Sequence, residues 1–225
     1  MKALIVANGA LPRPELDRAW LASSDGSRPL VVAADGGASN AARLGLQPDL
    51  IIGDLDSLPA DAVERYRHAG VELSAHSAQK DASDTELAVA EALRRGADEL
   101  VILAALGGQR AEHSLANVLL LTLPLLAGRD AMLVDGPSSV RVLGVAGADQ
   151  LTIHGEVGDF VSLLPLSEAA GGVTTGGMRY ALNDARLVQG TSRGLSNELA
   201  ASDATVAVGD GRLAVIHTRR QAVHG

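Results

Sequence analysis

Short apolar runs alternate with segments of helical spacing over roughly the first 145 residues. Most of the runs are apolar without interruption, a pattern typical of strands that are buried on both faces of a parallel sheet. The runs that predict strands are Ala3–Ala7, Leu30–Ala34, Leu50–Gly53, Val71–Ala75, Leu100–Ala105 and Ala131–Val134.

Helical spacing occupies the intervals between these runs. The clearest helix is expected to start after Ser83, whose hydroxyl can cap it while Glu86 reaches back, as in a capping box. Repeated strand–helix alternation predicts that residues 1–145 form an α/β domain with a mostly parallel sheet. The expected helices are Glu15–Ala22, Ala38–Leu44, Ala60–His68, Asp84–Arg95 and Ser114–Leu126.

The pattern changes after about residue 146, where helical spacing gives way to short runs between turn residues. A Gly-rich stretch at residues 171–177 is expected to separate two strands, and Val206–Val215 predicts a hairpin around Gly209-Asp210-Gly211. Residues 146–225 therefore predict a C-terminal antiparallel β-sandwich domain. Its expected strands are Gln150–His154, Phe160–Leu164, Met178–Leu182, Ala204–Val208 and Leu213–His217.

Composition narrows the possible functions. The formal net charge of −8 disfavours a nucleic-acid partner, and the absence of cysteine excludes disulfides, Cys-bound zinc and Fe–S clusters. The longest apolar helical stretch, Val118 to Ala127, is far shorter than the roughly 20 residues of a membrane span. The opening residues favour a buried strand over a secretory signal, so we expect no membrane partner and a cytoplasmic location.

A pair of carboxylates follows the third expected strand. Asp54 and Asp56 are two positions apart, so in an extended backbone both side chains point the same way. Ligands of open α/β sheets bind beyond the carboxyl ends of the strands, and Mg²⁺ prefers oxygen ligands. The pair could therefore hold one magnesium ion. A polar turn that caps the next segment would give the same pattern.

A second acidic cluster, Lys80-Asp81-Ala82-Ser83-Asp84, follows the fourth expected strand. A divalent cation would relieve the repulsion among carboxylates at neighbouring strand ends, and Lys80 could meet a phosphate as a point charge. Asp84 also suits the first turn of a helix for purely structural reasons, because a carboxylate there is stabilised by the helix dipole.

A glycine-rich loop follows the fifth expected strand and opens a helix. Backbone N–H groups at such a start favour anions, and Arg110 could clamp a phosphate with its planar guanidinium. His113 and Asn117 are one turn apart and share a helix face. A structural connection, with His113 in a structural hydrogen bond, remains an equal alternative.

Two further stretches give only weak evidence of a binding site when each is considered alone. Asp35-Gly36 ends the second expected strand, and the glycine could let backbone approach a ligand, although a tight turn explains it equally well. Gly194-Leu195-Ser196-Asn197-Glu198 is a polar cluster that resembles a turn. The chain has no GxxxxGK[ST] loop, no GxGxxG after a strand, no HExxH and no GxSxG.

Taken in order, these blocks resemble the thiamine pyrophosphokinase family along nearly the whole chain. The blocks are ADGGA, GDLDS, KDASD, GGQRAEHSLAN, MRYAL and GLSNE. The resemblance implies an N-terminal α/β domain, a C-terminal β-domain, and a homodimer with active sites at the subunit interface. It also implies transfer of the pyrophosphoryl group of ATP to thiamine, giving thiamine diphosphate and AMP, with Mg²⁺ as cofactor.

The resemblance further implies residue roles. Asp54, Asp56 and Asp81 would hold magnesium and through it the ATP phosphates, with Asp84 assisting. The remaining roles are nucleotide binding by Asp35, Gly36, Ser57, Lys80, Arg110, His113 and Asn117, and thiamine binding by Ser196 and Asn197 from the β-domain of the partner subunit.

The chain departs from the family pattern in two places. Glu112 stands where the family usually has Asp before His113, and no aromatic residue follows Tyr180 to stack on thiamine. One alternative is a pyrophosphokinase acting on a 6-hydroxymethyl-dihydropterin, and another is a non-catalytic sensor of a nucleotide or thiamine phosphate. The general base is left open among the site carboxylates.

Overall fold

The computed structural model describes residues 1–22, 26–55, 58–76, 81–145 and 147–220. The chain divides into two compact units. Unit 1 comprises Met1–Leu120 and Arg129–Gly136, and unit 2 comprises Leu121–Gly128 and Pro137–Gly225.

Unit 1 is built on a parallel sheet with the strand order β6-β5-β1-β2-β3-β4. Its central side chains, among them Leu4, Ile51 and Ile102, are completely buried, as the uninterrupted apolar runs predicted. The sequence therefore predicted the parallel α/β sheet correctly. The strands are β1 Lys2–Val6, β2 Leu30–Ala34, β3 Leu50–Gly53, β4 Glu72–Ala75, β5 Glu99–Leu103 and β6 Asp130–Asp135.

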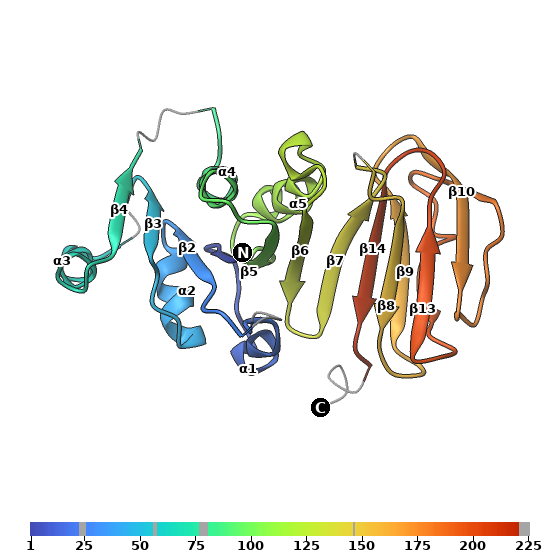
Figure 1. Cartoon of the computed structure of the whole chain (residues 1–225), viewed down its shortest axis with the longest axis horizontal. Coiled ribbons are helices and arrows are strands. Elements are labelled where there is room, and N and C mark those ends of the chain that lie inside the picture. The colour runs from blue at the N-terminus through green and yellow to red at the C-terminus, as the bar shows by residue number, and fades with distance from the viewer. Residues whose placement is uncertain (23–25, 56–57, 77–80, 146, 221–225) are drawn as a thin grey trace. The chain divides into compact units, whose positions relative to one another are not determined.

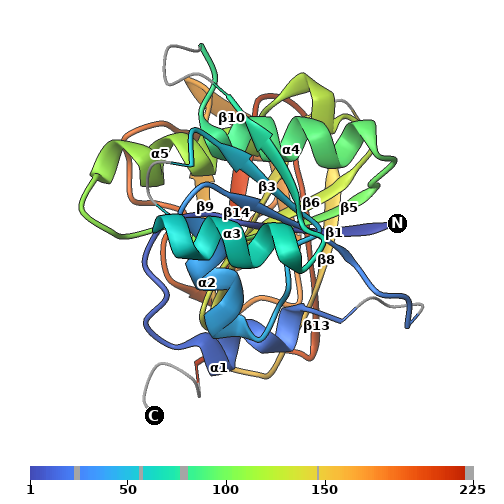
Figure 2. The same ribbon diagram turned by 90° about the vertical axis from the view of Figure 1, so that its left-hand side faces the viewer.

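Helices cover both faces of this sheet, with α2 and α3 on one face and α4 and α5 on the other (Figures 1 and 2). The first expected helix is only one α-turn followed by a 3₁₀ turn. The last expected helix, Ser114–Leu126, ends at Leu120, and Pro124 starts a separate 3₁₀ turn. The elements are α1 Pro14–Asp17, η1 Arg18–Trp20, α2 Gly37–Leu44, α3 Ala60–His68, α4 Asp84–Arg94, α5 Ala111–Leu120 and η2 Pro124–Leu126.

The start of α4 has the predicted cap. Ser83 Oγ accepts a hydrogen bond from the backbone N–H of Glu86 at 3.2 Å, which satisfies one of the donors left open at a helix start. This cap fixes the direction in which the first residues of α4, including Asp84, leave the preceding loop.

Unit 2 contains two groups of antiparallel strands, in the orders β12-β9-β14-β7 and β11-β10-β13-β8. Leu163 and Val215 from the first group and Val173, Leu187 and Val206 from the second share one core, which confirms the predicted β-sandwich. The strands are β7 Ser138–Leu143, β8 Gln150–His154, β9 Phe160–Pro165, β10 Ala169–Gly176, β11 Ala185–Val188, β12 Asn197–Glu198, β13 Asp203–Ala207 and β14 Leu213–Thr218.

The hairpin predicted at Val206–Val215 is wrong. β13 pairs with β10 and β8, whereas β14 pairs with β7 and β9, so the turn at residues 209–211 crosses from one sheet to the other. Backbone bonds hold this turn to β10: Gly209 N donates to Gly171 O at 2.9 Å, and Gly171 N donates to Asp210 O at 3.0 Å. The turn is therefore stabilised by hydrogen bonds to β10, and β13 and β14, the two strands that it joins, do not pair with each other.

The strand predicted at Met178–Leu182 is also wrong. The strand in this region is β10, which runs through the glycines that were expected to separate strands. A Cβ on Gly171 would stand 2.0 Å from Asp210 Oδ1, so these glycines permit close backbone approach. Met178 forms only an isolated bridge to Leu199.

No helix in the described part of the chain has both the length and the apolar character needed to cross a membrane.

Candidate functional site

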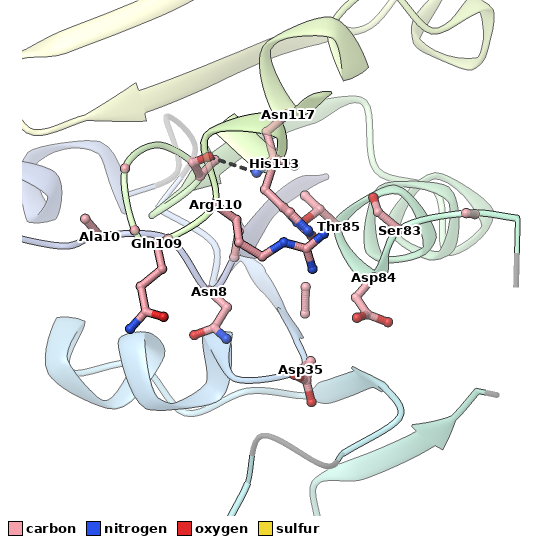
Figure 3. Close-up of a pocket in the computed structure, with 17 residues that line it drawn as sticks. Asn8, Ala10, Asp35, Ser83, Asp84, Thr85, Gln109, Arg110, His113 and Asn117 are labelled. Atoms are coloured by element: carbon pink, nitrogen blue, oxygen red, sulfur yellow. Dashed lines mark hydrogen bonds between the residues drawn. The ribbon is translucent and has the colours of Figure 1, made fainter. Parts of the chain in front are cut away.

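A polar pocket of about 690 Å³ lies in unit 1 at the carboxyl ends of β1, β2 and β5 (Figure 3). This is the position at which open α/β sheets bind their ligands. The loops after these strands and the first turns of α4 and α5 form its walls. The lining residues are Ala7, Asn8, Gly9, Ala10, Ala34, Asp35, Ala82, Ser83, Asp84, Thr85, Ala105, Gly107, Gly108, Gln109, Arg110, His113 and Asn117.

Asp35 is the most unusual residue of the pocket. It directly follows β2, is only 8% exposed, and adopts a left-handed backbone with φ of 47°. Its Oδ1 atom is buried and has no hydrogen-bond partner among the described residues. Burying an unpaired polar atom and holding a non-glycine residue at positive φ both cost free energy. A buried, unpaired and strained carboxylate in a pocket is typical of a residue that binds a ligand.

Asp84 and Asp35 both lie next to Gly53. A Cβ on Gly53 would stand 2.8 Å from Asp35 Cβ and 3.2 Å from Asp84 Oδ1, and Gly53 itself has φ of 154°. The absence of a side chain at Gly53 thus leaves a space that the side chains of Asp35 and Asp84 both border. Two carboxylates completed by substrate phosphates are a common magnesium arrangement, so this donor set fits the ion.

The other predicted acidic residues lie outside the pocket lining. Asp54 follows β3 and is partly buried, and Asp81 is exposed before α4. Asp56, Ser57 and Lys80 lie outside the described residues. Within the described ranges, no group of three Asp, Glu or His side chains could hold a metal ion. The magnesium set Asp54, Asp56 and Asp81 thus stays a prediction.

The loop after β5 brings Arg110 to the pocket, and helix α5 brings His113 and Asn117. Asn117 is buried and donates from Nδ2 to Ala105 O at 2.8 Å, which fixes the backbone where the strand leaves the sheet. Arg110 is exposed, and its Nε donates to Glu112 Oε1 at 2.7 Å. This hydrogen bond from Arg110 lowers the pKa of the Glu112 carboxyl.

The loop after β1 is a wall of the pocket that the sequence analysis missed. Gly9 N donates to Ala104 O at 2.7 Å, and Ala10 N donates to Leu106 O at 2.8 Å, so this loop is bonded to the loop after β5. The available signal was the position of Asn8-Gly9 directly after an apolar strand, where the other site residues also stand. Gly36 supports Asn8, because a Cβ on Gly36 would stand 2.4 Å from Asn8 Nδ2.

The predicted thiamine residues belong to unit 2. Asn197 is buried and joins the Met178–Leu182 segment to β12, since its Oδ1 accepts from Tyr180 N at 3.0 Å and its Nδ2 donates to Tyr180 O at 2.7 Å. Ser196 is exposed at φ of 56°, and its N–H donates to Ser162 Oγ at 3.0 Å. The guanidinium of Arg179 lies 5.5 Å from the centre of the exposed Tyr180 ring.

An open parallel sheet with a polar, partly acidic pocket at its strand ends defines an α/β protein of the class that binds small ligands at that edge of the sheet. Residues 24–132 match the family model described as the thiamin pyrophosphokinase catalytic domain. Residues 150–213 match the model described as the thiamin pyrophosphokinase vitamin B1 binding domain. The chain belongs to the thiamine pyrophosphokinase family.

Relatives from bacteria and plants are similar over most of their length. The thiamine pyrophosphokinase of Bacillus subtilis is 29% identical over 84% of this chain and 87% of its own. Thiamine pyrophosphokinase 2 of Oryza sativa is 26% identical over 91% of this chain and 81% of its own. A crystal structure of the thiamin pyrophosphokinase from Geobacillus thermodenitrificans matches with a TM-score of 0.80 and 28% identity, covering 99% of both chains.

Proposed function

We propose that this chain transfers the pyrophosphoryl group of ATP to the hydroxyethyl group of thiamine, giving thiamine diphosphate and AMP. Family membership supports the reaction. The observation that carries the site is the buried, unpaired Asp35 Oδ1 in a pocket that Asp84 also lines. A buried carboxylate without a hydrogen-bond partner is stabilised when a cation that carries phosphate ligands binds to it.

In this proposal Asp35 and Asp84 would hold Mg²⁺, together with the predicted Asp54, Asp56 and Asp81. The ion supplies charge neutralisation of the triphosphate when it is bound. Arg110 leaves Glu112 and donates to a phosphate oxygen, and His113 lies on the same wall. Asn117 holds the wall in place through Ala105.

The transfer is a single displacement. The hydroxyl oxygen of thiamine bonds to the β-phosphorus of ATP as the bond between that phosphorus and the α–β bridging oxygen breaks, and AMP leaves with the bridging oxygen. The hydroxyl proton passes to a site carboxylate. Catalysis then rests on positioning and on stabilising charge, with no covalent bond to the protein.

The rest of the assembly is part of the same proposal. The catalytic role falls to residues 1–145, and thiamine binding and dimerisation fall to residues 146–225. The protein acts as a homodimer in the cytoplasm, with Ser196 and Asn197 contacting thiamine at the subunit interface.

The test is AMP release by the pure protein with ATP, Mg²⁺ and either thiamine or a 6-hydroxymethyl-dihydropterin. Turnover with thiamine alone supports the proposal, and turnover with the pterin alone replaces it. Tight binding of nucleotide or thiamine diphosphate without any turnover would identify a sensor. The Asp84→Ala variant should bind AMP like the wild type and should lose turnover.

A further inference from the structure

Two side-chain amides in the pocket are available to a ligand. Asn8 and Gln109 both line it, and within the described part of the chain neither side chain makes a hydrogen bond. An amide offers two donors on its nitrogen and two lone pairs on its oxygen. Both residues are exposed, so water satisfies these groups until a ligand with complementary atoms replaces it.

The two amides project from loops that are joined to each other. The bonds from Gly9 N to Ala104 O and from Ala10 N to Leu106 O tie the loop after β1 to the loop after β5. The fit is close, because a Cβ on Gly9 would stand 2.5 Å from Ala104 O and one on Gly107 would stand 2.8 Å from Ala10 Cβ. The spacing between Asn8 and Gln109 is therefore set by paired backbone.

The Asn8 side chain also packs against Gly36. It lies over the backbone of Gly36, where a Cβ would meet its Nδ2 at 2.4 Å, its Cγ at 2.6 Å and its Oδ1 at 2.7 Å. Gly36 has φ of −57°, a conformation open to any residue, so its lack of a side chain is not needed for the backbone. The space above Gly36 is needed by Asn8.

The two amides and the carboxylate of Asp84 occupy different sides of the pocket. In Figure 3 the amides of Asn8 and Gln109 lie on one side and the carboxylate of Asp84 on the other, with Arg110 between them. Asp84 and Arg110 suit the metal-bound phosphates of the nucleotide. The neutral amide side then faces the part of the nucleotide that carries no charge.

We infer that Asn8 and Gln109 recognise the base of the nucleotide and select adenine. This inference rests on the proposed function. An Asn or Gln amide fits the N6 amino group and the N7 atom of adenine, because its oxygen accepts from the first and its nitrogen donates to the second. Guanine presents an oxygen in place of the amino group, so the same amide would place two acceptors face to face.

The test pairs nucleotide analogues with isosteric variants in the full-length protein. Purine riboside triphosphate lacks the amino group of ATP, and 7-deaza-ATP lacks the N7 acceptor. We expect kcat/KM of the wild type to fall about tenfold with either analogue, as one hydrogen bond is lost. In Asn8→Leu or Gln109→Met, the difference between ATP and at least one analogue should shrink to about twofold or less. Gln47 is an exposed amide that is not among the residues lining the pocket, so Gln47→Met should behave as the wild type.

Gly36→Ala gives a second, indirect variant. It changes no pocket amide but fills the space under Asn8, so it should reproduce the analogue profile of Asn8→Leu. Binding of AMP by calorimetry supplies a measurement that needs no turnover: wild type should bind AMP about tenfold tighter than GMP, and the variants should lose this preference.

Each outcome separates the inference from the proposed function. Absence of turnover with every nucleotide contradicts the proposed function, whereas turnover without base preference contradicts only the inference. An equal loss with ATP and both analogues in the variants would assign the amides a structural role and overturn it. A rise in the KM of thiamine with an unchanged nucleotide profile would place them against thiamine and overturn it as well.

Discussion

Asp84 Oδ1 lies 3.2 Å from the point where a Cβ on Gly53 would stand, and Asp35 Cβ lies 2.8 Å from the same point. The absence of a side chain at residue 53 therefore lets two acidic side chains, one after β2 and one at the start of α4, border the same space. We predict that Gly53→Ala lowers kcat by at least about tenfold. The new methyl group would contact the side chains of Asp35 and Asp84 and strain the backbone at residue 53, so it would displace the two carboxylates. AMP release under saturating substrates measures this.

Gly45→Ala is the matched control for the backbone. Gly45 ends α2 at φ of 78°, and a Cβ there would meet nothing within 4 Å. This variant should lose about 1 kcal/mol of unfolding free energy through backbone strain and keep its kcat. Full activity in Gly53→Ala would mean that the two carboxylates do not act together.

Asp35→Asn should abolish most activity without a loss of stability. The buried Oδ1 has no partner in the described part of the chain, so the neutral amide removes an unpaired charge that the fold has to bury. We expect kcat/KM to fall about 100-fold or more and the melting temperature to stay at or above that of the wild type. Steady-state kinetics and thermal unfolding of the same sample measure both.

The control for Asp35→Asn is Asp49→Asn. Asp49 pairs with Arg28 at 2.7 Å and accepts from Val31 N at 2.8 Å, so it is an aspartate with a structural task. The expected result is the reverse, a lower melting temperature with unchanged kcat. If Asp35→Asn also unfolded at a lower temperature, Asp35 would be a structural residue.

Glu112→Gln should tighten the interaction with ATP. In the structure the Glu112 carboxylate holds Arg110, which the proposed mechanism needs at a phosphate. We predict a KM for ATP that is about two- to threefold lower, no change in melting temperature because the pair is exposed, and convergence with the wild type at high salt. The opposite variant, Arg110→Gln, should raise the KM. A higher KM in Glu112→Gln would show that Glu112 itself contacts the substrate.

Asp159 should stabilise unit 2 in a pH-dependent way. Burial by itself raises the pKa of Asp159, but hydrogen bonds from the backbone N–H groups of Arg220 and Glu156 and from the His217 ring outweigh it and lower the pKa. A carboxyl whose folded pKa is lowered stabilises the fold above its unfolded pKa of about 4 and loses that effect as the pH falls through the folded pKa.

Asp159→Asn should accordingly cost about 2 kcal/mol at pH 7 and progressively less below about pH 4. Hydrogen exchange of the β14 amides measures unit 2 directly. Asp203→Asn is the control, because Asp203 bonds to His154 at 2.6 Å in an exposed His–Asp pair and should change nothing. A cost in Asp159→Asn that is constant from pH 7 to pH 3 would contradict the assignment.

Unit 1 could be predicted from the sequence because its signals are local. Uninterrupted apolar runs such as Leu50–Gly53 can be buried on both faces only in a parallel sheet, and Ser83 caps α4 through its own neighbour Glu86. The pocket residues Asp35 and Arg110 follow strands that the same pattern located, and Asp84 starts the helix that Ser83 caps. Asn8 was missed because a single Asn-Gly after a strand has the same appearance as an ordinary turn.

Unit 2 was predicted less well because its pairings are decided at a distance. The turn at residues 209–211 has the composition of a hairpin, yet Gly171, nearly forty residues earlier, supplies its hydrogen bonds. The glycines of β10 weaken it as a strand locally, and they are tolerated because β13 and Asp210 approach where side chains would stand. Neither relationship can be seen within a window of neighbouring residues.

The position of β14 has a consequence for how unit 2 is made. Residues 213–218 pair with both β7 and β9, so neither strand can make this pairing until that late segment has been synthesised. About seventy residues must therefore be synthesised after Ser138–Leu143 before this strand can pair with β14. Strand pairings between segments so far apart in the sequence form slowly. Any chain that stops short of residue 213 is deprived of a central strand rather than of an end.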